Sequence, residues 1–387
     1  MMTDNNLFFI QLNKILQVFV DDPFENMKLA YDIQMSLLDR ILKIENEIKS
    51  NKGKITRNKG ITKDKNTTND TRRKLSTESK NLKDESINLK EDIKRLREIG
   101  DSLAFAYFNK HDLKTLCWKQ TAGFIGGKEG LKKELYELKS IFESGRFAIL
   151  NDITNSLRYG DITIEKEGKP YLLEIKSSDN RNNRIIRQEK GLDEKMEVIQ
   201  NDYIENFEET NQTFKRVHTN KQEINYKEDL QLLIEEAFLK GKIIKEMEEG
   251  LTYAIYYKLE DFDSFKEVCQ NINEPRVFYI NQMKYINENY TPFPIIFKDE
   301  KSLMEFYNGN LIILVVIDLK VLRNKLKQKG YIFNHNENGE FTITFEHDGE
   351  DIDMVASNYH VTRIGREFIS LEWFINGIED VVNSVSS

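Results

Sequence analysis

The sequence predicts an α/β protein in three parts, because helical and strand-like patterns occupy separate stretches of it. Leucines recur every seven residues between residues 75 and 103, a spacing typical of a long helix with a coiled-coil seam. Residues 161–176 contain two short runs in which apolar and polar side chains alternate, as they do in strands. Apolar runs at 251–258 and 311–319 predict buried strands. We therefore expect a helical region at 1–115, an α/β domain at 116–260 and a smaller α/β domain at 261–387.

The helical region contains two apolar stripes that match each other. The first stripe lies between residues 29 and 48, and the second is the leucine repeat. The segment 51–71 between them is polar, low in complexity and interrupted by Gly53 and Gly60. These features predict an antiparallel helical hairpin over about residues 27–100, here called the arm, with a mobile tip at 51–71. The residues of the two stripes are Leu29, Ile33, Leu37, Ile41, Ile44, Ile48, Leu75, Leu82, Leu89, Leu96 and Leu103.

Charge is distributed unevenly along the chain. The formal net charge is -8, but residues 49–97 carry sixteen Lys or Arg against seven Asp or Glu. A basic segment on an acidic body leaves three interpretations of the arm open. It is a dimerisation arm, a basic probe along DNA, or a structural spacer whose lysines only keep its faces solvated.

The glycine-rich segment 123–128 precedes a predicted helix. Glu129 stands where a phosphate-binding P-loop needs Ser or Thr, which disfavours an ATP-dependent protein. Leu131, Leu135, Leu138 and Phe142 then recur at helical spacing. This predicts an amphipathic helix over residues 132–144 that packs on a sheet.

The two alternating runs are predicted to form a β-hairpin. The first run is 161–165, the second is 171–176, and the turn is expected at 168–170. In the second run Glu174 and Lys176 share one face, while Leu173 and Ile175 point to the core. The hairpin is expected to bring Asp161 beside Glu174.

These three polar groups suit the hydrolysis of phosphodiester bonds. Two carboxylates, Asp161 and Glu174, are suitable ligands for Mg²⁺, which prefers oxygen ligands and activates a bound water. Lys176 on the same face would orient that water or offset the charge that develops on phosphorus. The pattern therefore predicts a metal-dependent phosphodiesterase with Asp161, Glu174 and Lys176 as catalytic residues.

The arrangement of Gly160-Asp161, twelve intervening residues and Glu174-Ile175-Lys176 resembles the PD-(D/E)xK nuclease superfamily. The resemblance covers roughly residues 128–260, and Gly160 stands where the family name has proline. It implies a restriction-endonuclease-like fold, with a mixed sheet flanked by helices. It also implies dependence on Mg²⁺, for which Mn²⁺ substitutes, and a substrate of DNA or occasionally RNA. The carbonyl of Ile175 would be a further metal ligand.

Three further residues are auxiliary candidates. The superfamily often carries a metal-reaching glutamate on its first helix, and Glu134 lies at the edge of the apolar stripe there. Some branches place a glutamine after the Glu-x-Lys strand, where Gln188 follows here. The guanidinium of Arg158 has the bidentate geometry that binds phosphate. The alternative for each is an ordinary solvated side chain.

The same features allow a different function. Glu-x-Lys also occurs at 47–49, on a predicted helix, where it marks only a solvated face. The later copy has apolar neighbours and a preceding Gly-Asp, yet an ordinary hairpin with surface charges remains the alternative. In that case the chain is a non-catalytic coiled-coil scaffold or a DNA-binding interaction protein on a nuclease-like fold.

Composition also bears on whether the chain is a membrane protein, a secreted protein or a protein held by disulfides or zinc. No apolar run approaches the roughly twenty residues that span a bilayer, and residues 7–10 lack the flanks of a signal peptide, so a cytoplasmic protein without membrane contact is expected. Cys117 and Cys269 are too few and too far apart for a disulfide framework or a zinc site. Expected partners are DNA, a second copy bound through the arm, and an accessory protein. The resemblance favours a role in restriction or anti-phage defence.

Overall fold

The computed structural model divides the chain into two compact units, Met1–Phe207 and Glu208–Ser387. Both units combine helices with antiparallel sheets, which confirms the general α/β class. The structure describes residues 3–114, 116, 123–175, 183–204, 214–215, 221–259, 264–285, 290–335, 341–347, 350–356 and 358–385.

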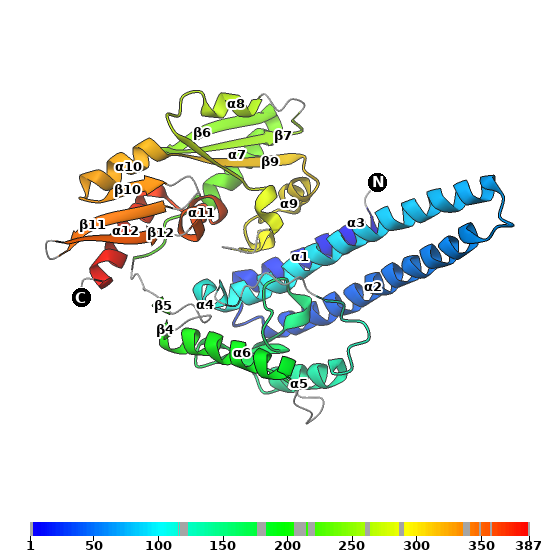
Figure 1. The fold of residues 1–387 in the computed structure, drawn as a ribbon. Coiled ribbons are helices and arrows are strands. Elements are labelled where there is room, and N and C mark those ends of the chain that lie inside the picture. The colour runs from blue at the N-terminus through cyan, green and yellow to red at the C-terminus, as the bar shows by residue number, and fades with distance from the viewer. Residues whose placement is uncertain are drawn as a thin grey trace. The chain divides into compact units, whose positions relative to one another are not determined.

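The predicted arm is formed by α2 (Met27–Lys63) and α3 (Asn69–Tyr107), which lie side by side and project beyond the rest of the first unit (Figure 1). The predicted tip at 51–71 is mostly helical, because both helices continue until only residues 64–68 connect them. The heptad spacing continues past Gly53 and Gly60 through polar seam positions such as Asn58. Asn58 is buried in the seam and donates from Nδ2 to Glu78 Oε2 at 3.0 Å.

The apolar seam is buried only in the half of the arm nearest the sheet. Leu75 and Leu82 are half-buried, because the outer half consists of two helices with no third element over them. Helix α1 (Asp4–Asp21) packs along α3 and supplies that third element at the base. The buried seam residues are Ile33, Leu37, Ile41, Ile44, Ile48, Leu89, Ile93, Leu96 and Leu103.

The predicted hairpin belongs to an antiparallel sheet with the order β1 (Ala148–Leu150), β2 (Ile162–Lys166), β3 (Lys169–Leu173). Its turn is Glu167-Gly168, both with positive φ, rather than residues 168–170. In β3 it is Leu172 that is fully buried, while Leu173 and Ile175 are half-buried. Both ladders of this sheet are antiparallel, so the parallel strand that a mixed sheet requires is not among these three.

Helices cover the sheet and close its edge. The predicted amphipathic helix is confirmed as α5 (Leu131–Glu143), which packs on β1, and α6 (Asn183–Asn201) packs on β3. Gln34 of α2 is fully buried and bonds the free edge of β1, donating to Ala148 O and accepting from Leu150 N, both at 2.9 Å. The remaining elements of this unit are α4 (Lys110–Lys114), η1 (Asn151–Ile153) and β4 (Tyr203–Ile204).

An aromatic cluster around Phe147 joins these layers. Its ring stacks on Tyr107 of α3 with centroids 3.8 Å apart and lies 5.9 Å from Phe19 of α1. Phe142 of α5 meets the same ring edge-on. The arm base and the sheet therefore share one core, and the arm is not separate from the sheet as a domain boundary at 115 would require.

The second unit is built on an antiparallel sheet with the order β6 (Lys242–Glu248), β7 (Leu251–Tyr257), β9 (Leu311–Asp318), β8 (Pro275–Tyr279). This confirms the strands predicted at 251–258 and 311–319, and β9 is buried along its whole length. Since β7 pairs with β9, the predicted boundary at 260 falls inside this unit and does not coincide with the division of the structure.

A second sheet, β10 (Ile332–His335), β11 (Phe341–His347) and β12 (Glu350–Ala356), is also antiparallel. No helix in the described part of the chain is both long and apolar enough to cross a membrane. The remaining elements are β5 (Phe214–Lys215), α7 (Lys227–Lys240), α8 (Ser264–Cys269), η3 (Gln282–Tyr285), η4 (Phe293–Ile295), α9 (Glu300–Tyr307), α10 (Leu319–Gln328), α11 (Asn358–Arg366) and α12 (Leu371–Val385).

Candidate functional site

The sheet of the first unit brings two aspartates to one of its ends. Strand β1 runs out into η1, which carries Asp152, and β2 begins immediately after Asp161. Because Leu150 pairs with Ile162 in an antiparallel ladder, the residues just beyond them also meet. Asn151 donates its backbone N–H to Asp161 O at 2.9 Å.

The turn before Asp161 requires glycine. Gly160 has φ +70°, and a Cβ added there would lie 2.8 Å from Leu173 O. Proline is locked near φ -65° and cannot take this conformation. This turn therefore explains why Gly160 precedes Asp161, where the PD-(D/E)xK signature has proline. Asn151 holds the turn by donating from Nδ2 to Tyr159 O at 2.7 Å.

Three carboxylates converge on the ammonium of Lys128. The Nζ atom lies 2.9 Å from Asp152 Oδ2, 2.9 Å from Asp161 Oδ1 and 3.0 Å from Glu134 Oε1. The side chain of Glu134 is 1% exposed and that of Asp161 15%, while Asp152 and Lys128 are about one-third exposed. We call these four residues the carboxylate cluster.

Glu134 is the most constrained member of the cluster. It lies in the first turn of α5, and its Oε2 is buried without a hydrogen-bond partner among the described residues. Burial raises the pKa of its carboxyl, the hydrogen bond from Lys128 opposes this, and the charge of Asp161 adds to it. Burial lowers the pKa of Lys128, but hydrogen bonds to Asp161 and Asp152 outweigh burial, and the pKa lies above its ordinary value.

Glu174 lies next to Asp161. The residues on its two sides both bond Asp161: the backbone N–H of Asp161 donates to Leu173 O, and Ile175 N–H donates to Asp161 Oδ2, both at 2.8 Å. The Glu174 side chain is exposed and Ile175 is half-buried. The hairpin therefore places the backbone on both sides of Glu174 against Asp161.

The structure says less about the three remaining residues that the sequence analysis proposed for the site. Lys176 lies outside the described residues. Gln188 belongs to α6, but its side chain is not among those that the structure describes. Arg158 is half-buried and donates from Nε to Asn155 O at 3.1 Å, within its own loop.

Two buried charged residues of the arm fix the segment that carries Lys128. Glu45 of α2 accepts from the backbone N–H groups of Ile125 and Gly126 at 2.9 and 2.7 Å. Arg97 of α3 donates to Gly123 O at 2.8 Å and to Asp152 O at 3.0 Å, and burial lowers its pKa to about 10. The amides of Ile125 and Gly126 are therefore used internally and do not form a phosphate cradle.

Sequence reasoning missed Asp152 and Lys128. Asp152 follows the apolar run 147–150, and an acidic residue at the end of a buried strand is a usable signal. Lys128 offers no comparable signal, since it meets Asp152 and Asp161 only through folding of the preceding loop.

The donor atoms of the cluster suit a hard divalent cation. They are carboxylate oxygens, which Mg²⁺ prefers, and Glu134 Oε2 is a buried acceptor to which no side chain or backbone group of the described residues donates. Within the described ranges no group of three His, Cys, Asp or Glu side chains is spaced to hold a metal ion. The three oxygens lie 2.9–3.0 Å from Lys128 Nζ, as expected for hydrogen bonds to an ammonium group. A magnesium ligand would lie closer to its ion, at roughly 2.1 Å.

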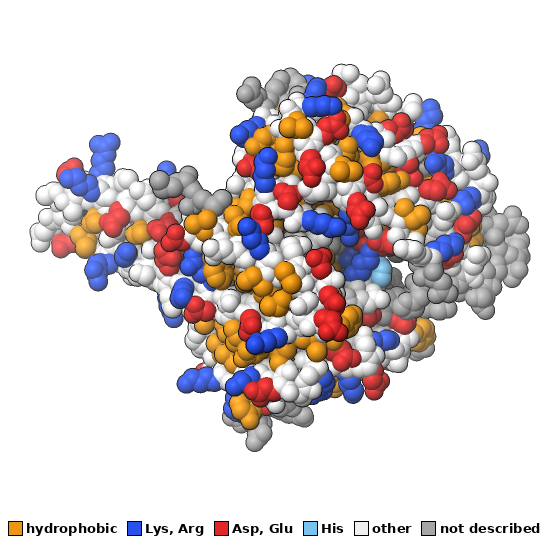
Figure 2. Space-filling model, turned by 180° about the vertical axis from the view of Figure 1, so that it is seen from behind, with side chains coloured by type: hydrophobic (Ala, Val, Ile, Leu, Met, Phe, Trp, Pro, Cys, Tyr) orange, Lys and Arg blue, Asp and Glu red, His pale blue; other side chains and the backbone are white. Residues whose placement is uncertain are grey.

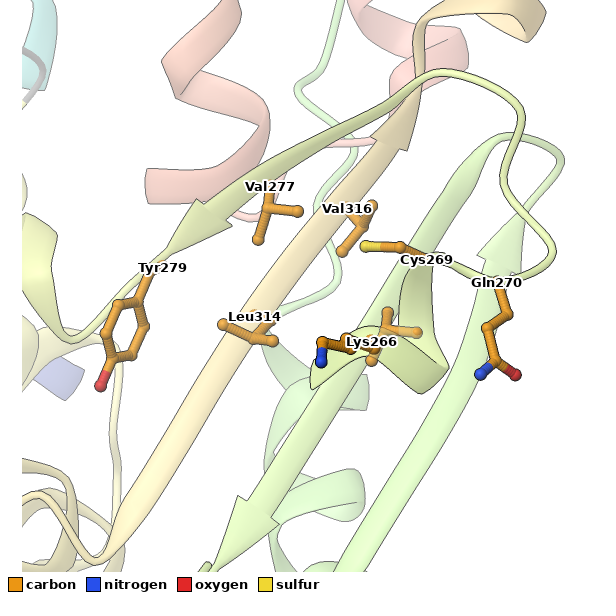
Figure 3. Close-up of a pocket in the computed structure, with 8 residues that line it drawn as sticks. Lys266, Cys269, Gln270, Val277, Tyr279, Leu314 and Val316 are labelled. Carbon is orange, nitrogen blue, oxygen red and sulfur yellow. The ribbon is translucent and has the colours of Figure 1, made fainter. Parts of the chain in front are cut away.

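The second unit has an open pocket of about 510 Å³ on its sheet, beside α8. Leu314 and Val316 of β9 and Val277 of β8 point into it, and Cys269 and Lys266 approach from α8 (Figure 3). Its lining is mostly apolar, and the described residues that form it include no carboxylate. The carboxylate cluster is thus the better candidate for hydrolytic chemistry.

Comparison of the chain with protein-family models, curated proteins and solved structures gives no match. The assignment of a function therefore depends on the geometry of the site itself.

Proposed function

We propose that this chain is a metal-dependent nuclease that hydrolyses phosphodiester bonds in DNA at the carboxylate cluster. The observation that carries the proposal is that oxygens of Glu134, Asp152 and Asp161 all lie within 3.0 Å of one positive group, the Lys128 ammonium. Glu174 directly follows β3, and the residues on its two sides both bond Asp161. The restriction-endonuclease-like fold belongs to the same proposal, supported by a helix, a three-stranded antiparallel sheet and the placement of Asp161 at its end.

Each residue has a role in this proposal. Asp161 and Glu174 would hold Mg²⁺ or Mn²⁺, with Glu134, Asp152 and the carbonyl of Ile175 as further oxygen donors. When bound, the metal polarises a phosphoryl oxygen and lowers the pKa of a water. Ile175 N–H fixes the orientation of Asp161, and Lys176 orients the attacking water.

The arm supports DNA as the substrate. Residues 49–83 carry twelve Lys or Arg against three Asp or Glu, and phosphate contacts depend on such basic surfaces. Basic side chains project from both edges of the arm, interspersed with acidic ones (Figure 2). A role in restriction or anti-phage defence is the setting that the family resemblance suggests.

The test is cleavage of plasmid and linear DNA by the purified chain with Mg²⁺, Mn²⁺ or EDTA. Asp161→Asn and Glu174→Gln should each lower the rate by about 100-fold or more, as loss of an electrostatic contact at a reacting phosphate does. Glu137→Gln, on an exposed position of α5, is the matched control and should cleave like the wild type.

The alternative is a non-catalytic scaffold or DNA-binding protein. The observation that favours it is the pairing of Lys128 with all three carboxylates, which also describes a structural ion-pair network. DNA binding without cleavage under any metal condition would support this alternative over the nuclease.

A further inference from the structure

Lys128 occupies the position in the carboxylate cluster where a bound cation would be placed. We propose that Lys128 is a built-in counter-cation, which neutralises the cluster in the metal-free protein and must leave before a divalent metal binds. This inference rests on the proposed function, because it assigns the regulation of metal entry at the same site.

The first step is the charge that the cluster must balance. Three carboxylates face one ammonium, and Glu134 is almost completely buried. A buried carboxylate without a cation is strongly unfavourable. Among the described residues, Lys128 is the positive group that all three carboxylates contact, so its removal takes away the charge that balances them there.

The second step is mutual exclusion. The same Oδ1 of Asp161, Oδ2 of Asp152 and Oε1 of Glu134 that accept from Lys128 are the oxygens a metal would use. A divalent ion drawn to about 2.1 Å from these oxygens would lie against the ammonium. Like charges at such a separation repel strongly where water is partly excluded. The ammonium and the metal therefore compete for one position.

The third step is a route by which Lys128 can leave. The hydrogen bonds that tie this segment to the arm are at Gly123, Ile125 and Gly126, all of which precede Lys128. The lysine side chain has four rotatable bonds, and here it is 33% exposed. Rotation of this side chain toward solvent clears the position without any change in the anchored backbone.

The direct test is calorimetric titration of the full chain with Mn²⁺ in the absence of DNA. Lys128→Met removes the charge and keeps much of the apolar length. We expect it to bind Mn²⁺ about tenfold more tightly than the wild type, because the competing cation is gone. Lys132→Met, at an exposed position of α5, is the matched control and should bind like the wild type. Unchanged or weaker binding by folded Lys128→Met would overturn the proposal.

A second measurement uses only the wild-type protein and so does not depend on a variant that folds. Acetylation of lysines is followed by mass spectrometry with and without Mn²⁺. Lys128 should react several-fold faster when Mn²⁺ is present, because the metal releases its amine, whereas Lys132 should react at an unchanged rate. Equal or slower labelling of Lys128 with Mn²⁺ contradicts the proposal.

The two proposals fail in different ways. If the wild type cleaves DNA but Lys128→Met gains no affinity, the nuclease stands and the counter-cation role is refuted. If Mn²⁺ displaces Lys128 but no DNA is cleaved, the counter-cation role stands and the nuclease is refuted. If neither protein binds Mn²⁺, both are refuted.

Discussion

Gly100 lets α3 approach the site more closely than any other residue would. A Cβ at this position would lie 2.2 Å from Ile153 O in η1, the turn that also carries Asp152. We expect Gly100→Ala to lower the free energy of unfolding by about 1–3 kcal/mol, the usual cost of overpacking. Alanine's better helix propensity, about 1 kcal/mol, offsets only part of this. Urea unfolding followed by circular dichroism measures the difference.

Gly60 is the matched control for that substitution. It lies inside α2, with no atom within 4 Å of an added Cβ. Gly60→Ala should therefore stabilise the chain by up to about 1 kcal/mol through helix propensity alone. If both substitutions change the free energy of unfolding by the same amount, the close approach to Ile153 does not explain why residue 100 is glycine.

Individual site residues differ in how far sequence can predict them. Asp161 and Glu174 were predictable because strand alternation and one short hairpin determine which residues are opposite each other. Glu134 was predictable as a candidate because helical spacing places it beside an apolar stripe. Lys128 was not, because the position of its segment depends on a hydrogen bond donated to Glu45 and another accepted from Arg97, both of which are distant in sequence.

At the scale of elements, Asp318 joins a strand to a helix. It ends β9, caps α10, and accepts from Lys320 N at 2.9 Å, Asn273 N at 3.1 Å and Glu274 N at 3.3 Å. Burial raises the pKa of its carboxyl, but these hydrogen bonds outweigh burial and the pKa lies below the ordinary 3.8.

The sign of that shift gives a pH prediction. A depressed carboxyl pKa stabilises the fold above the ordinary value of 3.8, and this contribution is lost as pH falls through the lower folded value. Asp318→Asn should cost about 1–3 kcal/mol at pH 7, as loss of charge-assisted hydrogen bonds does. The difference from the wild type should shrink below pH 3.8 in urea unfolding series. A difference that stays constant down to pH 3 would mean that the charge of Asp318 contributes nothing.

Periodicity predicted the elements better than composition did. The heptad repeat predicted the arm, alternation predicted the hairpin, and continuous apolar runs predicted the buried strands of the second unit. Polar composition suggested a loop at 51–71, yet Asn51 and Asn58 occupy seam positions and are buried between the helices. Spacing was the better guide there because two long helices continue to pair wherever the seam register is kept, even at polar positions.

At the scale of the whole chain, the charge is divided between a basic arm and an acidic remainder. Residues 49–97 carry a net charge of +9 against -8 for the chain, which leaves the remainder at about -17 by the same count. An acidic body repels nucleic acid, so the arm is the segment expected to bring DNA to the chain. Sequence alone showed this asymmetry, but it did not show that the lysines line two continuous helices.

The arm therefore gives a salt-dependent prediction. Replacing Lys52, Lys59 and Lys80, all exposed, with glutamine should weaken DNA binding and reduce the slope of log affinity against log salt by about 2–3, near 0.9 for each lost phosphate contact. Fluorescence anisotropy with Asp161→Asn protein, which should not cut the probe, measures both quantities. An equal slope change in a control with three exposed lysines of the second unit replaced would refute a specific role of the arm in DNA binding. Sedimentation of the same variants tests the competing interpretation. If the arm serves dimerisation, these substitutions should change the mass of the sedimenting particle and leave the salt slope of DNA binding unaltered. The control lysines are Lys240, Lys245 and Lys327.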